Sequence, residues 1–323
     1  EIDKAHGLPN ECYTSNDYLD FERDSVFLKN WTVIGTASSV SEIGDTRPFD
    51  LIGIPLMIVR DREKNIRVFH NVCSHRGHKL VDKVCKSRKL IVCPYHSWSY
   101  NLNGELIRTP HIGGLNKHEL EGFNKNSSDL KEVRSCVWMD LVFVNINSNA
   151  KDFNTSIKPL EDRWSKFITK DDQKLIYHAK NFGNFEMSVN SNWKFAIENY
   201  CESYHLPSIH PELNRVSNIE DHYHIEDESM TFSGQGSMKY SQQFDGNKKF
   251  STFPNWPNHL YENSEYVSLF PNLMMGIHVD HFFAFWLEPL SMTQTKEHFE
   301  MYYIGKESAC SEDYKELRKK NFL

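Results

Sequence analysis

Two short stretches, Cys73-Ser74-His75 and Cys93-Pro94-Tyr95-His96, decide how this chain is interpreted. The first is a Cys-x-His pair, the second is a Cys-x-x-His pair, and 17 residues separate them. A Rieske [2Fe–2S] cluster is held by two Cys and two His, with both His on one iron. Each stretch offers one ligand of each kind, so each stretch can reach both irons. The spacing therefore predicts that Cys73, His75, Cys93 and His96 hold such a cluster.

A structural zinc site is the alternative for the same four residues. Zinc fingers usually place both Cys in one pair and both His in the other, whereas the two kinds are mixed here. His78 and Cys85 lie between the pairs and fit neither spacing, so we expect them to be loop or packing residues. The mixed order favours the iron–sulfur cluster.

A second metal pattern lies in residues 192–211, NWKFAIENYCESYHLPSIHP. The apolar spacing before Pro207 predicts a helix with Glu202 and His205 on one stripe of its surface. Pro207 cannot continue the helical hydrogen bonds, so we expect the chain to turn and bring His210 back beside His205. Two His and one carboxylate form the facial triad of non-heme Fe(II) oxygenases. We therefore predict that His205 and His210 bind Fe(II).

Both patterns resemble the motifs of the Rieske non-heme iron oxygenase family, alpha subunit. Residues 73–77 and 93–98 are similar to its cluster loops, CxHRG and CPYHGW, with Ser97 in place of the more common Gly. Residues 192–211 are similar to its iron motif, NWK…EN…[DE]xYHxxxxHP. The order of the two motifs also matches, and the resemblance covers nearly the whole chain.

The resemblance implies a role for each of these residues. The positions of His205 and His210 bind Fe(II) in the family. The acid three residues before the first His does not bind iron but connects it by hydrogen bonds to the Rieske His of a neighbouring subunit in a head-to-tail trimer. By this resemblance, Glu202 is the catalytic residue that links His205 to His96 of the next subunit. Ring-hydroxylating members usually have Asp at this position. The Glu found here resembles the branch of the family that oxidises carnitine, glycine betaine, choline and related methylammonium compounds.

The third iron ligand of the family is an Asp on the last helix of the catalytic domain. This chain begins at Glu1 and ends at Leu323, inside a helix that we expect Ser311 to cap. The sequence therefore predicts a fragment that stops short of that Asp. Asp280 and Asp313 are alternatives within the chain, and neither has the expected setting.

The remaining sequence predicts an α+β chain. A helix is expected over Asn16–Lys29, capped by Ser15 and with Phe21 on its apolar side. The run Val137–Ile146 is expected to be one buried strand. Further strands are expected at Trp31–Thr36, Leu56–Arg60, Ile66–His70, Asn181–Val189, Met230–Tyr240, His281–Leu287 and His298–Tyr303.

The resemblance implies an all-β Rieske [2Fe–2S] domain and an α+β helix-grip catalytic domain with an antiparallel sheet. The expected domains are an N-terminal helical segment packing on the catalytic domain (1–30), the Rieske domain (31–150) and the catalytic mononuclear-iron domain (151–323).

Composition excludes several function classes. The 323 residues carry a formal net charge of −7 and no basic run, which argues against a nucleic-acid or anionic-membrane partner. No apolar stretch approaches the roughly 20 residues of a membrane span. Seven Cys without a framework spacing indicate a reduced, cytoplasmic protein. No Gly-rich dinucleotide motif follows a strand, so electrons are expected from a separate NAD(P)H-dependent reductase or ferredoxin.

The predicted function is an oxygenase component that uses O₂ and delivered electrons to hydroxylate, demethylate or cleave a small organic substrate. The alternatives are an aromatic-ring-hydroxylating dioxygenase alpha subunit, a Rieske electron carrier with a binding domain, and a non-catalytic scaffold. An aromatic cage for a trimethylammonium group is one interpretation of the aromatic residues of the second half, and core packing is the simpler one. These residues are Phe253, Trp256, Tyr261, Phe282, Phe283, Phe285 and Trp286.

Overall fold

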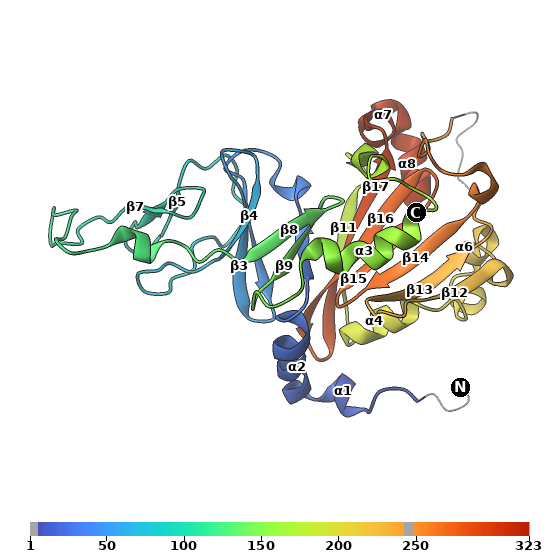
Figure 1. Ribbon diagram of the computed structural model, residues 1–323, viewed down its shortest axis with the longest axis horizontal. Helices are drawn as coiled ribbons and strands as arrows, with labels where there is room; N and C mark the ends of the chain where they lie inside the picture. The colour runs from blue at the N-terminus through green and yellow to red at the C-terminus, as the bar shows by residue number, and fades with distance from the viewer. Residues whose placement is uncertain (1–5, 242–247, 323) are drawn as a thin grey trace. The chain divides into compact units, whose positions relative to one another are not determined.

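The computed structural model describes residues 6–241 and 248–322 (Figure 1). The chain folds into two compact units, one of residues Val33–Ala150 and one of the residues up to Thr32 together with those from Lys151 on. The first holds small antiparallel sheets and the second holds a large antiparallel sheet with helices. The predicted α+β class is therefore confirmed.

The first unit contains three sheets of three strands, in the orders β1-β9-β8, β2-β3-β4 and β5-β6-β7. The strands are β1 (Thr32–Thr36), β2 (Thr46–Leu51), β3 (Ile54–Arg60), β4 (Ile66–His70), β5 (Ile91–Val92), β6 (Ser99–Tyr100), β7 (Leu106–Arg108), β8 (Arg134–Trp138) and β9 (Leu141–Asn145). Two short 3₁₀ helices, η3 (Ser38–Val40) and η4 (Lys125–Ser128), lie between them. The second predicted cluster loop, 93–98, joins β5 to β6.

The prediction of one strand over Val137–Ile146 is wrong, because β8 and β9 form a hairpin there. Met139 and Asp140 have positive φ angles of 47° and 69°. A two-residue hairpin turn needs positive φ at both central residues, and Asp tolerates that conformation. The Asp140 carboxylate also accepts hydrogen bonds from the backbone N–H of Ser38 (2.9 Å) and from its hydroxyl (2.6 Å). Hydrophobicity alone does not reveal this turn.

The second unit is built on one antiparallel sheet in the order β10-β17-β16-β15-β14-β13-β12, with β11 also paired to β17. Its strands are β10 (Ile176–His178), β11 (Asn184–Val189), β12 (His222–Glu226), β13 (Phe232–Ser237), β14 (Ser264–Leu269), β15 (Leu273–Ile277), β16 (His281–Ser291) and β17 (Gln294–Ile304). Its helices are α3 (Phe153–Trp164), α4 (Trp193–Tyr200), α5 (Leu206–Ile209), α6 (Pro211–Val216), α7 (Lys306–Cys310) and α8 (Lys315–Phe322), with short 3₁₀ helices η5 (Asp172–Leu175), η6 (Ile219–Asp221), η7 (Asn258–Leu260) and η8 (Glu312–Tyr314).

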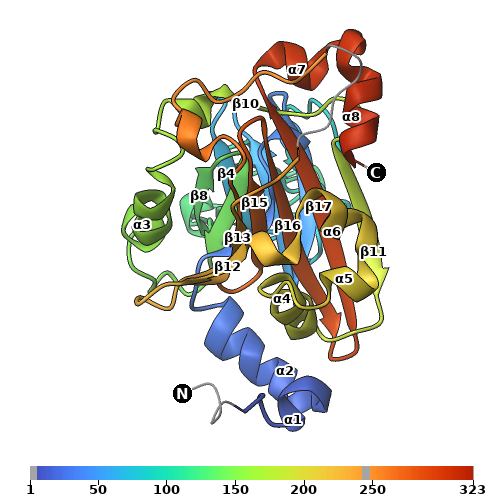
Figure 2. The same cartoon turned by 90° about the vertical axis from the view of Figure 1, so that its right-hand side faces the viewer.

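The two faces of this sheet bury different side chains, because neighbouring residues of a strand point to opposite faces. Strand register places Gln235, Tyr266, Gly276 and Phe283 in one row across β13 to β16. We call the face that carries this row the Tyr266 face. Figure 2 shows α4, α5 and α6 in front of the strands, and the ring of Tyr200 at the end of α4 lies 6.5 Å from that of Tyr266. The iron motif therefore lies over the Tyr266 face.

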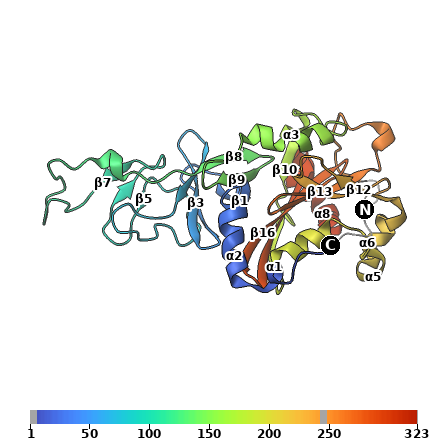
Figure 3. The same ribbon diagram turned by 60° about the horizontal axis from the view of Figure 1, so that its bottom comes forward.

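The N-terminal segment packs on α4 through polar contacts. It comprises α1 (Glu11–Thr14), α2 (Asn16–Glu22) and a π-helical turn, η2 (Arg23–Phe27), drawn in dark blue in Figure 3. Ser15 makes no side-chain cap hydrogen bond, and Phe21, predicted to be on the apolar side, is 57% exposed. Glu22 is buried instead, because its carboxylate accepts hydrogen bonds from Trp193 Nε1 (3.0 Å) and Lys194 Nζ (2.7 Å). Tertiary partners thus override the local apolar pattern.

Candidate metal centres

The two predicted cluster loops share one backbone pattern. In each loop the N–H of the Cys donates to the carbonyl five residues on, at 2.8 Å, and the N–H four residues on donates to the Cys carbonyl, at 2.9 and 3.0 Å. The residues at this fourth position, Gly77 and Ser97, have φ angles of 72° and 58°. Only Gly adopts this left-handed conformation at no steric cost. Ser97 therefore occupies a position that favours Gly.

The predicted ligands from the two loops lie together. Cys73 and Cys93 are each 2% exposed and belong to one buried cluster, and, after burial itself, Cys93 contributes to the raised pKa of the Cys73 thiol. The rings of His75 and His96 are 4.7 Å apart between centroids. Burial is the largest cause of the raised pKa of the Cys73 thiol and of the lowered pKa of His75. The structure thus brings two buried thiols and two imidazoles to one place.

These residues fit the cluster that the spacing predicts. The Nδ1 atom of His75 is buried and has no hydrogen-bond partner among the described residues, a costly arrangement unless a ligand completes it. Among residues 6–241 and 248–322, no three His, Cys, Asp or Glu side chains gather as for a single metal ion. A Rieske cluster takes two protein ligands on each of its irons, two Cys on one and two His on the other.

Sequence reasoning missed Tyr100, whose hydroxyl lies 3.3 Å from Cys73 Sγ and accepts a hydrogen bond from the Ser74 N–H (3.1 Å). The residue is fully buried on β6. No spacing in the sequence selects it, because the contact spans 27 positions of the chain. Hydrogen bonds to cluster sulfurs tune reduction potentials, so Tyr100 joins the candidate residues of this centre.

The predicted helix of the iron motif is interrupted. α4 ends at Tyr200, a turn follows, and α5 begins at Leu206 with Pro207 in its first turn. Proline at the start of a helix loses no hydrogen bond, so Pro207 begins a new helix instead of ending the old one. Glu202 and His205 therefore lie in the turn, and the prediction that they share a helical stripe is wrong.

The turn still brings the predicted iron ligands together. The rings of His205 and His210 are 5.3 Å apart between centroids. The Glu202 carboxylate lies 2.5 Å from His205 Nδ1, and Asn199 Nδ2 lies 3.2 Å from both ring nitrogens of His205. A neutral imidazole that donates through Nδ1 keeps its lone pair on Nε2. Such a ring is oriented to bind a metal through Nε2.

A third ligand does not join them in the described ranges, where no group of three potential metal ligands is found. Asp280 is buried 2.7 Å from His281 Nδ1, and Asp313 lies in η8. Neither alternative is thus brought to His205 and His210. The Glu202 carboxylate meets the Nδ1 side of the His205 ring.

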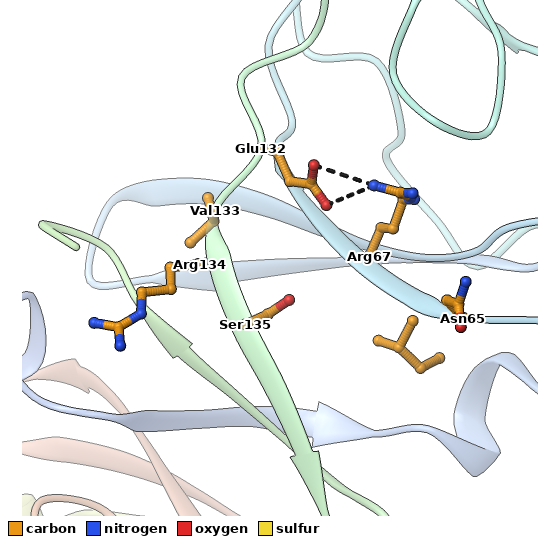
Figure 4. Close-up of a pocket in the computed structure, with 7 residues that line it drawn as sticks. Asn65, Arg67, Glu132, Val133, Arg134 and Ser135 are labelled. Carbon is orange, nitrogen blue, oxygen red and sulfur yellow. Dashed lines mark hydrogen bonds and ion pairs between the residues drawn. The ribbon is translucent and has the colours of Figure 1, made fainter. Parts of the chain in front are cut away.

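A hollow on the first unit is lined by Asn65, Ile66, Arg67, Glu132, Val133, Arg134 and Ser135 (Figure 4). Its arginines are engaged: Arg67 contacts Glu132 (3.0 Å) and Asp61 (2.9 Å), and Arg134 donates to the Ala150 carbonyl (2.5 Å). None of the predicted ligands lines this hollow, so it adds nothing to either centre.

Comparison with known proteins identifies the family. Residues 30–119 match the Rieske [2Fe-2S] domain, and residues 176–322 match the ring hydroxylating alpha subunit (catalytic domain). The chain belongs to the Rieske oxygenase alpha-subunit family. These are oxidoreductases, and the two matched domains imply a [2Fe–2S] cluster and a mononuclear iron, as predicted.

Several relatives are similar in sequence over most of this chain. The carnitine monooxygenase oxygenase subunit of Acinetobacter pittii (strain PHEA-2) is 26% identical over 321 residues, covering 98% of this chain and 80% of the relative. The chloroplastic choline monooxygenase of Arabidopsis thaliana is 25% identical over 287 residues, covering 85% of this chain and 62% of the relative. Within the Rieske oxygenase family, the chain is therefore similar to the carnitine, glycine betaine and choline branch.

Solved structures share the fold. A quaternary ammonium Rieske monooxygenase in complex with L-carnitine has a TM-score of 0.75 at 22% identity, covering 97% of this chain and 79% of that one. Naphthalene 1,2-dioxygenase with indole has a TM-score of 0.74 at 19% identity, covering 96% and 73%. In residues 6–241 and 248–322, no helix combines the length and the apolar character needed to cross a membrane.

Proposed function

We propose that His205 and His210 bind Fe(II), that Cys73, His75, Cys93 and His96 hold the Rieske cluster, and that the chain oxidises a small quaternary ammonium compound. The observation that carries the proposal is the contact between Glu202 and His205, 2.5 Å, beside His210. This arrangement contains an imidazole oriented by a carboxylate, His205, and a second imidazole, His210, beside it. The carboxylate of Glu202 orients His205 and is not proposed as an iron ligand.

Glu202 acts on the proton of the His205 ring. Its carboxylate accepts the Nδ1–H, which fixes the tautomer and leaves Nε2 for the metal. The turn reinforces this contact, because the backbone N–H of His205 also points at the carboxylate (3.3 Å). A second carboxylate lone pair remains for another donor. We propose that this donor is His96 of a neighbouring subunit in a homotrimer.

Held by His205 and His210, a mononuclear iron would supply the O₂ activation of non-heme iron oxygenases. The protein's part is to hold the two imidazoles and to carry the electron path through Glu202. A separate NAD(P)H-dependent reductase or ferredoxin would reduce the cluster. Several relatives are oxygenase subunits by name, which supports a separate partner of this kind.

The substrate proposal rests on two observations. Relatives of the chain are named for carnitine, choline and glycine betaine, and Glu202 stands where ring-hydroxylating members usually carry Asp. The Tyr266 face also presents aromatic rings near α4: the ring of Phe283 lies 6.3 Å from that of Tyr266. Aromatic faces attract methylammonium groups. Phe282 and Trp286 point to the opposite face and are fully buried, as core packing predicts.

Substitution of the imidazoles tests the iron assignment. His205→Ala and His210→Ala should each lose bound Fe(II) and oxygenation but keep the EPR spectrum of the reduced cluster, because the two centres are in different units. His224→Ala, at an exposed His on β12 of the same sheet, is the matched control and should retain both. Wild-type turnover in either His205 or His210 variant would contradict the assignment.

A turnover screen tests the substrate class. The protein with a reductase should oxidise carnitine, glycine betaine or choline, and should release no product from simple aromatic acids. Product from the aromatic acids alone would instead support the alternative of a ring-hydroxylating dioxygenase.

A further inference from the structure

The amide side chain of Gln235, on the sheet, hydrogen-bonds with the backbone of the turn that carries Glu202. The last carbonyls of a helix have no partner within it. At the end of α4, Gln235 Nε2 donates to the carbonyls of Tyr200 (3.0 Å) and Glu202 (2.9 Å). Gln235 is 7% exposed and projects from β13 on the Tyr266 face. A strand distant in sequence thus supplies the cap of the helix that leads into the iron motif.

The direction of every hydrogen bond around Gln235 is determined. Both N–H groups of its amide are used on the two carbonyls, so its Oε1 must accept from His222 Nδ1 (2.8 Å). That ring then carries a proton on Nδ1, and its Nε2 lies 2.9 Å from the Ser217 hydroxyl; in the neutral ring this nitrogen accepts the hydroxyl proton. The series Ser217, His222, Gln235 has one donor and one acceptor at each step. Gln235 consequently has one orientation only.

Two further polar side chains lie near the same turn. Cys201 lies between the two capped carbonyls; burial raises the pKa of its thiol, and Ser233 and Ser268 act against that rise. Ser233 is two residues from Gln235 on β13, and the register pairs it with Ser268 on β14. The hydrogen bonds that hold the turn itself are those of Gln235.

We propose that Gln235 is a positioning residue for the mononuclear-iron site: it fixes the backbone from Tyr200 to Glu202 and so holds the Glu202 carboxylate on His205 Nδ1. The inference rests on the proposed roles of His205 and Glu202. It adds a residue that touches neither the metal nor either imidazole ligand. Without the amide, two carbonyls lose their partner and the turn is free to shift, which loosens the contact that orients His205.

The test compares Gln235→Met with Gln294→Met, in the full chain. Methionine has nearly the same length as glutamine but donates no hydrogen bond. Gln294 is exposed at the start of β17 on the same sheet, so its variant controls for the substitution itself. Two quantities are measured: hydrogen–deuterium exchange of the peptide spanning residues 201–205, which needs no metal, and Fe(II) affinity by competition with a chromophoric chelator.

Gln235→Met should exchange roughly tenfold faster in this peptide and bind Fe(II) about 10–100-fold more weakly, as for other residues that orient metal ligands. The EPR spectrum of the cluster should not change, and Gln294→Met should match the wild type throughout. A folded Gln235→Met with native exchange and native affinity overturns the inference. A general loss of stability would instead raise exchange over the whole sheet, which also overturns it.

If Gln235→Met does not fold, His222→Phe decides. It keeps both bonds to the carbonyls but removes the donor that orients the amide, so exchange over 201–205 should rise by a smaller factor, roughly threefold. Unchanged exchange in His222→Phe overturns the inference. Wild-type protein that binds no Fe(II) would contradict the proposed function, and the exchange measurement would still decide the role of Gln235.

Discussion

Removing the Glu22 carboxylate should destabilise the second unit strongly. The Glu22 side chain is 5% exposed and the Lys194 side chain 9% exposed, with 2.7 Å between Oε1 and Nζ. Trp193 Nε1 donates to the other carboxylate oxygen at 3.0 Å. The Lys194 ammonium lies 5.2 Å from the Trp193 ring and 5.3 Å from the Tyr13 ring. Glu22→Ala would therefore leave an ammonium and an indole N–H buried without their acceptor.

Breaking one side of a buried ion pair costs about 3–5 kcal/mol. For a unit of this size, a loss of about 4 kcal/mol lowers the melting temperature by roughly 8–16 °C. Replacing both partners, in Glu22→Met with Lys194→Met, should cost far less, because no buried charge remains. The control is Lys158→Met in the exposed Lys158–Asp162 pair of α3, where the change should stay below about 0.5 kcal/mol.

Calorimetric melting of the three variants and the wild type measures these differences. The expected order of stability is wild type and Lys158→Met together, then the double variant, then Glu22→Ala. A Glu22→Ala protein that melts within about 2 °C of the wild type, less than 1 kcal/mol, would refute the reasoning. So would a double variant as unstable as Glu22→Ala.

Two further predictions concern other strained or buried positions. Ser97→Gly should stabilise the first unit by about 0.5–1 kcal/mol, and Gly77→Ala should destabilise it by about 1–2 kcal/mol. Both positions have a positive φ, and nothing lies within 4 Å of a Cβ placed on Gly77, so the effect comes from the backbone conformation. Denaturant titration of each variant checks this, and equal effects of the same sign would contradict it. Burial, and to a lesser degree the nearby His281, hold the pKa of His278 well below its usual range. The folded protein therefore favours the neutral imidazole. This contribution to stability is fully present above the unfolded pKa of about 6.5 and is lost as the pH falls below that value. His278→Phe should therefore lose less unfolding free energy than the wild type between about pH 7.5 and pH 5.5, and urea titrations at both values that show equal losses would refute it.

The sequence predicted what depends on local spacing. The proposed cluster ligands and the proposed iron histidines, which the structure brings together, and strands such as β4 follow from patterns that a few neighbouring residues define. β4 has the predicted bounds, Ile66–His70, and Ser311 caps η8, the 3₁₀ helix directly before α8, through the N–H of Asp313 (3.2 Å). These features need no knowledge of distant residues.

The errors come from contacts across the chain or from backbone conformation. Glu22 is buried because Lys194, 172 positions away, pairs with it. The β8–β9 hairpin depends on positive φ at Met139 and Asp140, and the break after Tyr200 depends on Pro207 starting a helix. Gln235 could not be selected from the sequence, because its role exists only once β13 lies beneath the turn.

The central claim is that Glu202 orients His205 and carries electrons toward the mononuclear iron. Glu202→Gln keeps the shape of the side chain but removes the charge that accepts the Nδ1–H. The direct measurement is a single turnover: the cluster is reduced first, substrate and O₂ are added, and the oxidation of the cluster is followed by absorbance. The account predicts that Glu202→Gln still binds both metals and is still reduced, yet oxidises its cluster roughly 10–100-fold more slowly than the wild type. Oxidation at the wild-type rate would contradict the claim and would make Glu202 an ordinary surface acid.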